Sequence, residues 1–245
     1  MNALLARIDA NKAAIDQYRP MEEPLLSQLR AYYRVGLTWS SNALEGSSLT
    51  ESETKVLLED GLTVGGKPIR DYYEATGHAE AYDAMFTLLE GRRTPTEGDI
   101  LLLHRLFYSR IDEAQAGKYR SQRVFITGSA HTPPPPANVP GEMEAFPLWM
   151  RYEADALHPV VFAAQVHKRF VFIHPFIDGN GRVARLLMNL CLLRAGYTLA
   201  IVPPILRGEY IQTLEQAHAD DAAFTHFIAE RVLETQKDIL RMLKG

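Results

Sequence analysis

Residues 174–185 read His-Pro-Phe-Ile-Asp-Gly-Asn-Gly-Arg-Val-Ala-Arg. The Gly-Asn-Gly turn at 179–181 lets backbone amides approach a ligand closely, because glycine adds no side-chain bulk. A helix is predicted to begin directly after this turn, and the free amides and dipole of a helix N-terminus favour an anion. Pro175 disfavours a helical conformation at the residue before it, so His174 is predicted at a helix-to-loop boundary with its ring projecting outward. The segment therefore predicts an anion site beside an imidazole.

Charged side chains flank this turn. Arg182 and Arg185 lie three residues apart in the first turn of the predicted helix, and two guanidinium groups there suit a polyphosphate. Asp178 supplies a hard oxygen ligand for Mg²⁺, and His174, with an ordinary pKa of about 6.5, suits a general base. Each feature alone also fits a helix-joining turn, a structural histidine, a capping carboxylate or a solvated arginine pair. Their coincidence in one loop-to-helix unit favours a functional site.

Composition places the chain among ordinary globular proteins. It has 245 residues, of which 47% are hydrophobic and 23% charged, which fits one large domain or two small ones. The net charge of −4 argues against a direct nucleic-acid partner bound by bulk electrostatics. The single cysteine, Cys191, excludes an internal disulfide and is expected to be buried and inert. No signal peptide or membrane-spanning stretch is apparent, so a cytoplasmic protein without a membrane partner is expected.

Apolar spacing predicts an all-α fold, a helical bundle. Capping patterns start two helices at Thr50 and Thr96. The other helices are predicted over residues 2–18, 25–35, 71–89, 142–155, 159–172, 181–194, 208–217 and 221–243. We expect an N-terminal helical region over 1–90 and a core with C-terminal helices over 91–245, packed as one compact unit.

One segment interrupts the helical pattern. Residues 121–127 are β-prone and are followed by Gly128, Ser129 and a run of four prolines at 133–136. Prolines lack amide donors and favour an extended path. A small β-hairpin followed by a stiff surface strap is therefore expected here, although an ordinary connector between helices would also fit.

Residues 174–185 resemble the signature of the Fic family, HPFx[D/E]GNGRxxR, at every fixed position. The resemblance extends from about residue 30 to 235 and includes the β-prone flap and the proline run. It implies the all-α Fic fold with a small β-hairpin flap, and transfer of AMP from ATP to a Ser, Thr or Tyr hydroxyl of a protein substrate.

The resemblance also assigns roles to residues of the site. His174 would deprotonate the hydroxyl, Asp178 would bind Mg²⁺, and Phe176 would anchor the loop. Nucleotide-binding residues would be Gly179, Asn180 and Gly181 as the anion hole, Arg182 near the β-phosphate, Arg185 near the γ-phosphate, and Tyr210 in the adenine-covering segment. Tyr210 equally fits core packing. The flap, Val124, Phe125, Ile126 and Thr127, would hold the target backbone by strand addition. His167 is expected to serve packing rather than a catalytic zinc site.

A second motif lies at residues 41–46, Ser-Asn-Ala-Leu-Glu-Gly. Taken alone it fits a helix that ends at Gly46 with Ser41 and Glu45 on an exposed face. Within a Fic-like chain it resembles the inhibitory motif [S/T]xxxE[G/N]. This implies that Glu45 pairs with Arg185 and takes the space of the γ-phosphate, in the class II arrangement.

Other functions remain open at this level. With water as the nucleophile, the same site would remove AMP from a modified target, with Glu45 activating that water. A relative of this kind could also transfer UMP, phosphocholine or phosphate, or the chain could be a nucleotide-sensing regulatory module without turnover. ATP, Mg²⁺, a protein substrate and a second copy in a homodimer are the expected partners.

Overall fold

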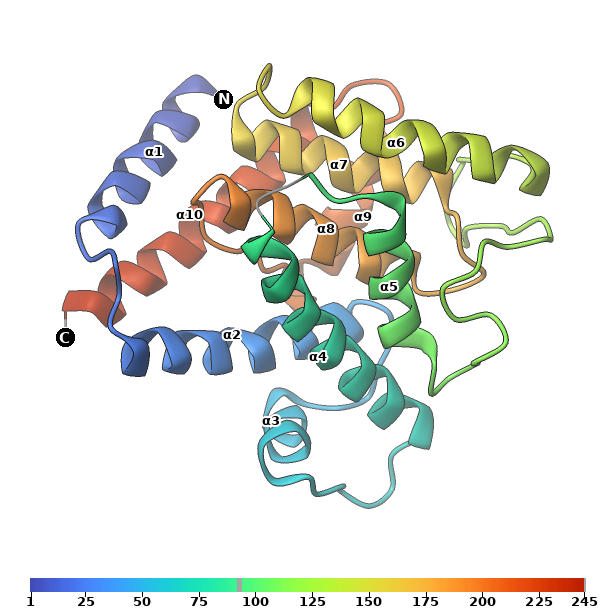
Figure 1. Ribbon diagram of the computed structural model, residues 1–245, viewed down its shortest axis with the longest axis horizontal. Coiled ribbons are helices and arrows are strands. Elements are labelled where there is room, and N and C mark those ends of the chain that lie inside the picture. Colours follow the sequence, from blue (N-terminus) through green and yellow to red (C-terminus); the bar gives the residue numbers. More distant parts are fainter. Residues whose placement is uncertain (92–93, 245) are drawn as a thin grey trace.

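The structure is a computed structural model that describes residues 1–91 and 94–244 (Figure 1). Ten α-helices and two short 3₁₀ helices account for its regular structure in this part of the chain. The first five helices are α1 (Asn2–Asp16), α2 (Glu23–Ala43), α3 (Glu51–Asp60), α4 (Ile69–Glu90) and α5 (Glu97–Tyr108). The last five are α6 (Val139–Glu153), α7 (Pro159–Ile173), α8 (Asn180–Arg194), α9 (Arg207–Gln216) and α10 (Ala222–Lys244). The predicted all-α class is confirmed.

The helix α8 lies at the centre of the molecule and packs against α7, α4 and α2 (Figure 1). Its apolar run, which no charged residue interrupts, is buried on all sides, as expected for a helix enclosed by others. The fully buried members are Leu186, Leu187, Met188 and Leu192. Because this helix is fixed on every side, its N-terminus is held rigidly at one place in the core.

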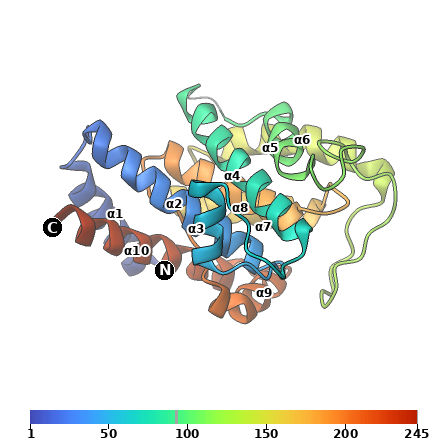
Figure 2. The same cartoon turned by 90° about the horizontal axis from the view of Figure 1, so that it is seen from below.

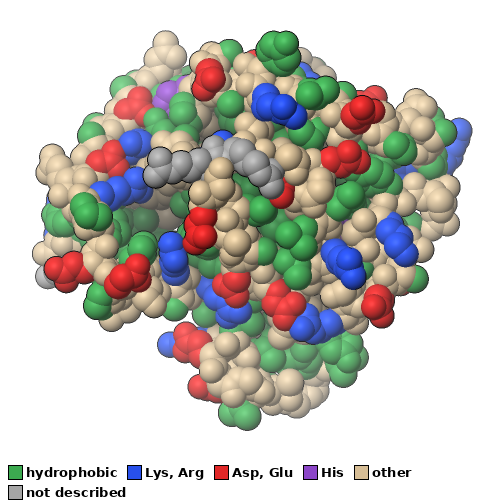
Figure 3. Space-filling model, viewed as in Figure 1, with side chains coloured by type: hydrophobic (Ala, Val, Ile, Leu, Met, Phe, Trp, Pro, Cys, Tyr) green, Lys and Arg blue, Asp and Glu red, His purple; other side chains and the backbone are tan. Residues whose placement is uncertain are grey.

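Helices from the two ends of the chain meet. The first helix, α1, packs along α10, so that Ile8, Ile15 and Ile239 belong to the same buried cluster as α8 (Figure 2). The predicted capping box of α3 is present, with Thr50 and Glu53 bonded to each other's backbone amides. None of the described helices has the length and apolar character required to cross a membrane. Acidic and basic side chains are interspersed over the face shown in Figure 3.

The predicted β-hairpin is wrong for the part of the chain that the structure describes. Residues 121–135 form an extended loop between α5 and α6, without a strand (Figure 2). A short turn from Ile126 to Ser129 reverses the chain, with Gly128 at φ +80°. The two arms of the described loop make no ladder of backbone hydrogen bonds. On the return arm, the amides of Ala130 and His131 donate to the side chains of Glu215 and Ser129, and the prolines that follow at 133–136 have no amide to donate. The predicted strap is extended at Pro135, with φ −54° and ψ 146°, but Pro136 already begins the first 3₁₀ helix (Pro136–Asn138).

Candidate active site

His174 ends α7 in a left-handed conformation, with φ 49° and ψ 59°. A non-glycine residue there is uncommon, and such backbone strain concentrates at functional sites. Its Nδ1 lies 3.2 Å from the carbonyl oxygen of Val171. A carbonyl only accepts, so Nδ1 carries the proton and Nε2 is left with a free lone pair. Burial, together with the positive charge of Arg120, lowers the pKa of His174 to about 4, so the imidazole is neutral at pH 7.

The loop between α7 and α8 is closed by a side chain from its own sequence. Asn180 accepts a hydrogen bond from the amide of Phe176 and donates one to its carbonyl, both at 2.9 Å. Phe176 is fully buried, as expected for an anchor. Asn180 therefore shapes the loop through its side chain, while its backbone begins α8.

His104 of α5 packs against the same loop and hydrogen-bonds it. The amide of Gly117 donates to His104 Nδ1 at 2.9 Å, so the ring proton is on Nε2, which donates to the Asp178 carbonyl at 3.1 Å. The imidazole also stacks on Phe176 with 3.6 Å between ring centroids. Gly179 has φ +79°, and a Cβ added to it would lie 2.7 Å from the ring of Phe107. The first glycine of the turn is thus required by both conformation and space.

The second arginine of the segment is buried and meets the end of α2. Arg185 Nη2 lies 2.8 Å from Glu45 Oε1, and Nε donates to Ser41 Oγ at 2.9 Å. The same Nη2 donates to the Ser41 carbonyl at 2.8 Å, and Nη1 to the Tyr210 hydroxyl at 3.2 Å. Sequence positions 41, 45 and 185 are therefore brought together, and Ser41 is buried rather than on an exposed face.

Glu45 also lies directly over the start of α8. A Cβ added to Gly181 would overlap Glu45 Oε1. The side chain of Glu45 keeps 36% of its exposure, so it reaches the helix end from the solvent side. Partial burial opposes its ionisation, but the charges of Arg185 and Arg182 hold the pKa of Glu45 below its ordinary value. A carboxylate thus occupies the place at this helix N-terminus that favours an anion.

A closed ring of four charged side chains joins α4 to the loop. Glu74, which is buried, accepts from Arg182 Nη1 at 3.0 Å and from Arg70 Nε at 2.9 Å. Asp178 accepts from Arg182 Nη2 at 3.1 Å and from Arg70 Nη2. Two carboxylates and two guanidinium groups alternate, so the ring has no net charge. Arg182 is thereby fixed on both sides and lies over the Phe107 ring at 4.5 Å.

Asp178 is the carboxylate available to a cation at this site. Burial raises its pKa, but Arg182, the Gly179 amide and Arg70 outweigh this and hold the pKa below its ordinary value. No group of three or more His, Cys, Asp or Glu residues that could hold a metal ion occurs among the described residues. A single carboxylate fits Mg²⁺ when phosphate oxygens and waters supply the other ligands. The residues therefore fit a metal that arrives with a polyphosphate.

Tyr210 and His167 form a buried pair behind Arg185. The Tyr210 oxygen accepts from Arg185, so its proton points to His167 Nε2 at 2.8 Å. Burial lowers the pKa of His167 to about 3, so the ring is neutral. His167 thus acts as a packed hydrogen-bond acceptor, as expected.

A cleft of about 480 Å³ brings the predicted residues together. Its lining includes Glu45, His174, Asp178, Gly181 and Tyr210. The predicted flap residues Phe125, Ile126 and Thr127 also line it, whereas Val124, Arg182 and Arg185 do not. His174, the start of α8 and the loop at 125–127 therefore face the same space.

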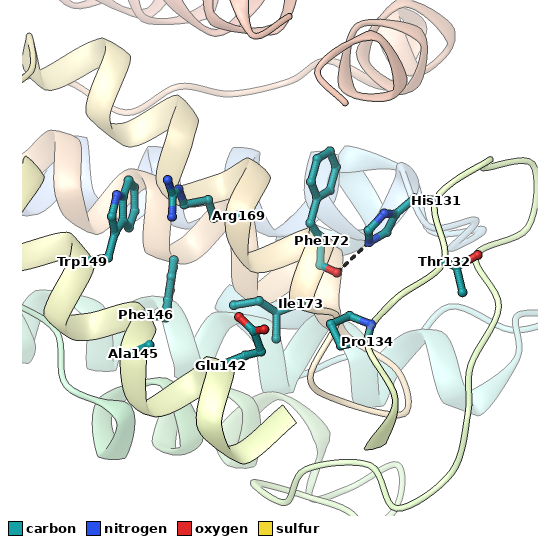
Figure 4. Close-up of a pocket in the computed structure, with 10 residues that line it drawn as sticks. All are labelled: His131, Thr132, Pro134, Glu142, Ala145, Phe146, Trp149, Arg169, Phe172 and Ile173. Carbon is teal, nitrogen blue, oxygen red and sulfur yellow. Dashed lines mark hydrogen bonds between the residues drawn. The ribbon is translucent and has the colours of Figure 1, made fainter. Parts of the chain in front are cut away.

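A second cavity of about 360 Å³ lies beyond the proline strap, between α6 and α7 (Figure 4). His131, Thr132 and Pro134 of the strap form one wall, and Trp149 and Arg169 lie at the other end. His131 Nε2 donates to the Phe172 carbonyl at 2.7 Å. Because His131 and Phe172 line both cavities, the strap separates two adjoining hollows.

Four supporting residues were missed at the sequence level: Arg70, Glu74, His104 and Arg120. The first two precede the signature by about a hundred residues, and nothing in their spacing marks them. His104 reads in the sequence as no more than a helix-face or core residue. A buried charge can be found only when its partners in space are known.

The described residues form an all-helical protein in which the start of a buried helix lies beside a neutral imidazole in one cleft. Residues 94–192 match the family model described as "Fic/DOC family", so this part of the chain is a Fic/DOC domain.

Curated relatives extend the match beyond that domain. The Protein adenylyltransferase Fic of Nematostella vectensis is 40% identical over 194 residues, which cover 78% of this chain and 45% of that protein. The protein of the same name from Drosophila willistoni is 36% identical over 229 residues, covering 92% of this chain and 45% of the relative. The chain thus spans less than half the length of the curated relatives it matches.

Solved structures show the same architecture. Fic-1 from C. elegans superposes with a TM-score of 0.88 at 27% identity, over 99% of this chain and 72% of that one. A Fic domain containing signaling protein from Bacteroides thetaiotaomicron gives a TM-score of 0.86 at 27% identity, over 96% of this chain and 95% of that one.

Proposed function

We propose that this chain is a protein adenylyltransferase that transfers AMP from ATP to a Ser, Thr or Tyr hydroxyl of a target protein. The observation that carries the proposal is one cleft in which a neutral His174 faces the anion-binding start of α8. Relatives with 36–40% identity are named protein adenylyltransferases, which supports the same chemistry here.

In the proposed reaction His174 Nε2 takes the proton of the acceptor hydroxyl. The oxygen attacks the α-phosphorus of ATP, the bond from that phosphorus to the bridging oxygen of the β-phosphate breaks, and pyrophosphate leaves. Amides of residues 179–181 and the α8 dipole hold the phosphates, with Arg182 near the β-phosphate and Arg185 near the γ-phosphate. The protein contributes position and charge stabilisation rather than covalent chemistry.

Asp178 would hold Mg²⁺ against the phosphates, and the metal would neutralise part of their charge. For this, the carboxylate must exchange its contact with Arg70 for the metal. The buried Glu74 keeps Arg182 and Arg70 close to Asp178 during such an exchange.

We further propose that Glu45 restrains the enzyme from within, as in the class II arrangement. Its carboxylate takes the contact with Arg185 and the space over Gly181 that a γ-phosphate requires. ATP would then bind poorly, or in a pose unsuited to attack by the acceptor.

The loop at 124–127 would dock the target. It is extended, Phe125 is 85% exposed, and no strand of the described chain pairs with it. A target strand could therefore add to its free edge and bring the acceptor towards His174. A homodimer and a cytoplasmic location stay predictions of the sequence.

The experiment uses the full chain with Glu45→Gly, incubated with α-labelled ATP and Mg²⁺ in a cell lysate and followed by mass spectrometry. We expect AMP on a hydroxyl of the chain itself or of a captured target, and no AMP with Glu45→Gly combined with His174→Ala. Loss of AMP from a modified target would instead show the reverse reaction. ATP binding with no change in any protein would contradict transfer and favour a nucleotide sensor.

A further inference from the structure

Arg120 is a buried cation outside the signature, in the loop that leads from α5 to the flap. Its exposure is 3%, and no carboxylate of the described residues forms an ion pair with it. Burial lowers the pKa of Arg120. Burying a guanidinium without an acidic partner costs free energy. The hydrogen bonds that Arg120 makes must therefore offset this cost, and they indicate what the residue holds in place.

All polar contacts of the Arg120 side chain are to main-chain carbonyls. Nε donates to the His174 carbonyl at 2.7 Å, Nη2 to that of Pro134 at 2.6 Å, and Nη1 to that of Gln122 at 3.2 Å. In addition, the Arg120 amide donates to the Pro175 carbonyl at 2.9 Å. One planar group thus bonds three carbonyls, one on its own arm and two on distant stretches of chain, through three different nitrogens, a spread that the single ammonium nitrogen of a lysine does not offer.

The three bonded carbonyls lie in the flap loop and at His174. Gln122 and Pro134 lie at the two ends of the extended loop that carries the flap, and Pro134 lies beside Ile173 in the view of Figure 4. The third is the strained residue that carries the base. On the return arm of the loop, the Ala130 amide bonds Glu215 and the His131 ring bonds the Phe172 carbonyl of α7. Arg120 therefore connects the outgoing arm of the flap directly to His174.

We propose that Arg120 is a positioning residue that holds the target-docking flap and the His174 backbone in one fixed geometry. The inference rests on the proposed transfer reaction. Arg120 does not itself line the cleft, and its side chain bonds none of residues 178–185, so it acts through the residues it bonds, His174 among them. Its loss should misplace the acceptor relative to the base and leave nucleotide binding intact.

The test compares Arg120→Gln and Arg120→Lys, each in the Glu45→Gly chain. We expect ADP affinity, measured by calorimetry, to stay within about twofold. The rate of AMP incorporation should fall on the order of 10- to 100-fold with an unchanged KM for ATP, because misplacement of reacting groups by about 1 Å has effects of this size. Hydrogen exchange at residues 122–134 should become faster in both variants.

A pH profile separates charge from geometry. The positive charge of Arg120 helps to lower the His174 pKa, so Arg120→Gln should move the acid limb of the rate profile to higher pH. Arg120→Lys keeps the charge, so its acid limb should stay near that of the parent while its rate still falls. If Arg120 served only to stabilise the fold, both variants would lose rate and neither would shift the acid limb of the pH profile.

Ile8→Val is the control for lost stability, since Ile8 is fully buried between α1 and α10 and far from the site in sequence. It should lower the melting temperature without changing flap exchange or incorporation. Flap exchange or incorporation equal to the parent in both Arg120 variants overturns the inference. If the Glu45→Gly chain itself transfers no AMP, the proposed function is wrong. Hydrogen exchange at residues 122–134 then decides by itself whether Arg120 holds the flap.

Discussion

The Glu45 carboxylate lies 2.8 Å from the Arg185 guanidinium, across 140 residues of sequence. Arg185 is 2% exposed, and Glu45 is the only acid with which it forms an ion pair among the described residues. The contact ties the end of α2 to the first turn of α8. The charge environment at the start of α8 therefore includes a residue that precedes the signature by more than half of the chain.

Replacing Glu45 should weaken the resting fold and strengthen nucleotide binding. Glu45→Gly leaves a buried guanidinium without its acid, while its bonds to Ser41 and Tyr210 remain, so we expect a loss of about 1–3 kcal/mol in the free energy of unfolding. Saturating ATP should restore more stability to the variant than to the wild type. Urea unfolding with and without ATP measures both, with Glu45→Gln as the control that keeps the shape of the side chain. Equal stabilisation by ATP in all three proteins would contradict the restraint.

A double-mutant cycle tests whether Glu45 and position 181 share space. In the resting chain, the Cβ of Gly181→Ala overlaps Glu45 Oε1, so the Glu45 side chain must move away from Arg185, and losing that contact to a buried charge should cost roughly 1–3 kcal/mol. In the Glu45→Gly chain that overlap is absent and only the contact with Arg185 Nη1 at 3.1 Å remains, so the cost should be clearly smaller. Additive unfolding free energies would show that the two residues do not compete for one place.

Glu74 should matter far more than another acid on the same helix. Glu74→Gln breaks a buried ring of charges, so we expect a loss of about 3–5 kcal/mol in unfolding free energy and weaker ADP binding. Glu80 on α4 pairs with Arg110 at the surface, with 40% exposure, and Glu80→Gln should change stability by less than about 1 kcal/mol. Thermal unfolding and ADP calorimetry distinguish the two. Similar losses in both variants would argue against a special role for the ring.

Stability should fall as the pH drops below about 6.5. Burial is the main cause that lowers four histidine pKa values to about 3 or 4, those of His78, His104, His167 and His174. The unfolded chain takes up these protons near pH 6.5, but the folded chain does not until pH 3–4. The stability that depends on these neutral rings is therefore fully present above pH 6.5. Each histidine should lower the free energy of unfolding by about 1 kcal/mol as the pH falls from 6.5 to 5.5.

Urea unfolding at several pH values measures this slope. The lowered pKa values of Glu45 and Asp178 act only at more acidic pH, so these carboxylates do not contribute in this interval. A His78→Asn variant should reduce the slope by about a quarter, since it removes one of the four protons. A free energy of unfolding that is constant from pH 7.5 to 5.5 would contradict neutral burial of these rings.

The sequence predicted the helices well because apolar spacing and capping residues act locally. The capping box at Thr50 and the long apolar run of α8 are cases in which propensity and burial agree. The predicted β-hairpin is wrong because β-propensity at 121–127 is realised only with a partner strand, and on the return arm the Ala130 and His131 amides bond side chains while the prolines at 133–136 have no amide. The motif at 41–46, read alone, places Ser41 on an exposed face, but Ser41 is buried, because the environment of a helix face depends on the neighbouring helix.

The sequence by itself indicated the turn at 174–181, because several of its contacts run over four residues or fewer: Asn180 to Phe176, His174 to Val171, and Asp178 to the next amide. Only the tertiary structure decided which distant side chains hold that loop and its charges. Arg120 reaches the His174 carbonyl across 54 residues, His104 reaches the Asp178 main-chain carbonyl across 74, and Arg70 reaches the Asp178 carboxylate across 108. A buried charge is stabilised by whatever lies next to it in space, and packing of distant helices, not sequence spacing, selects that neighbour.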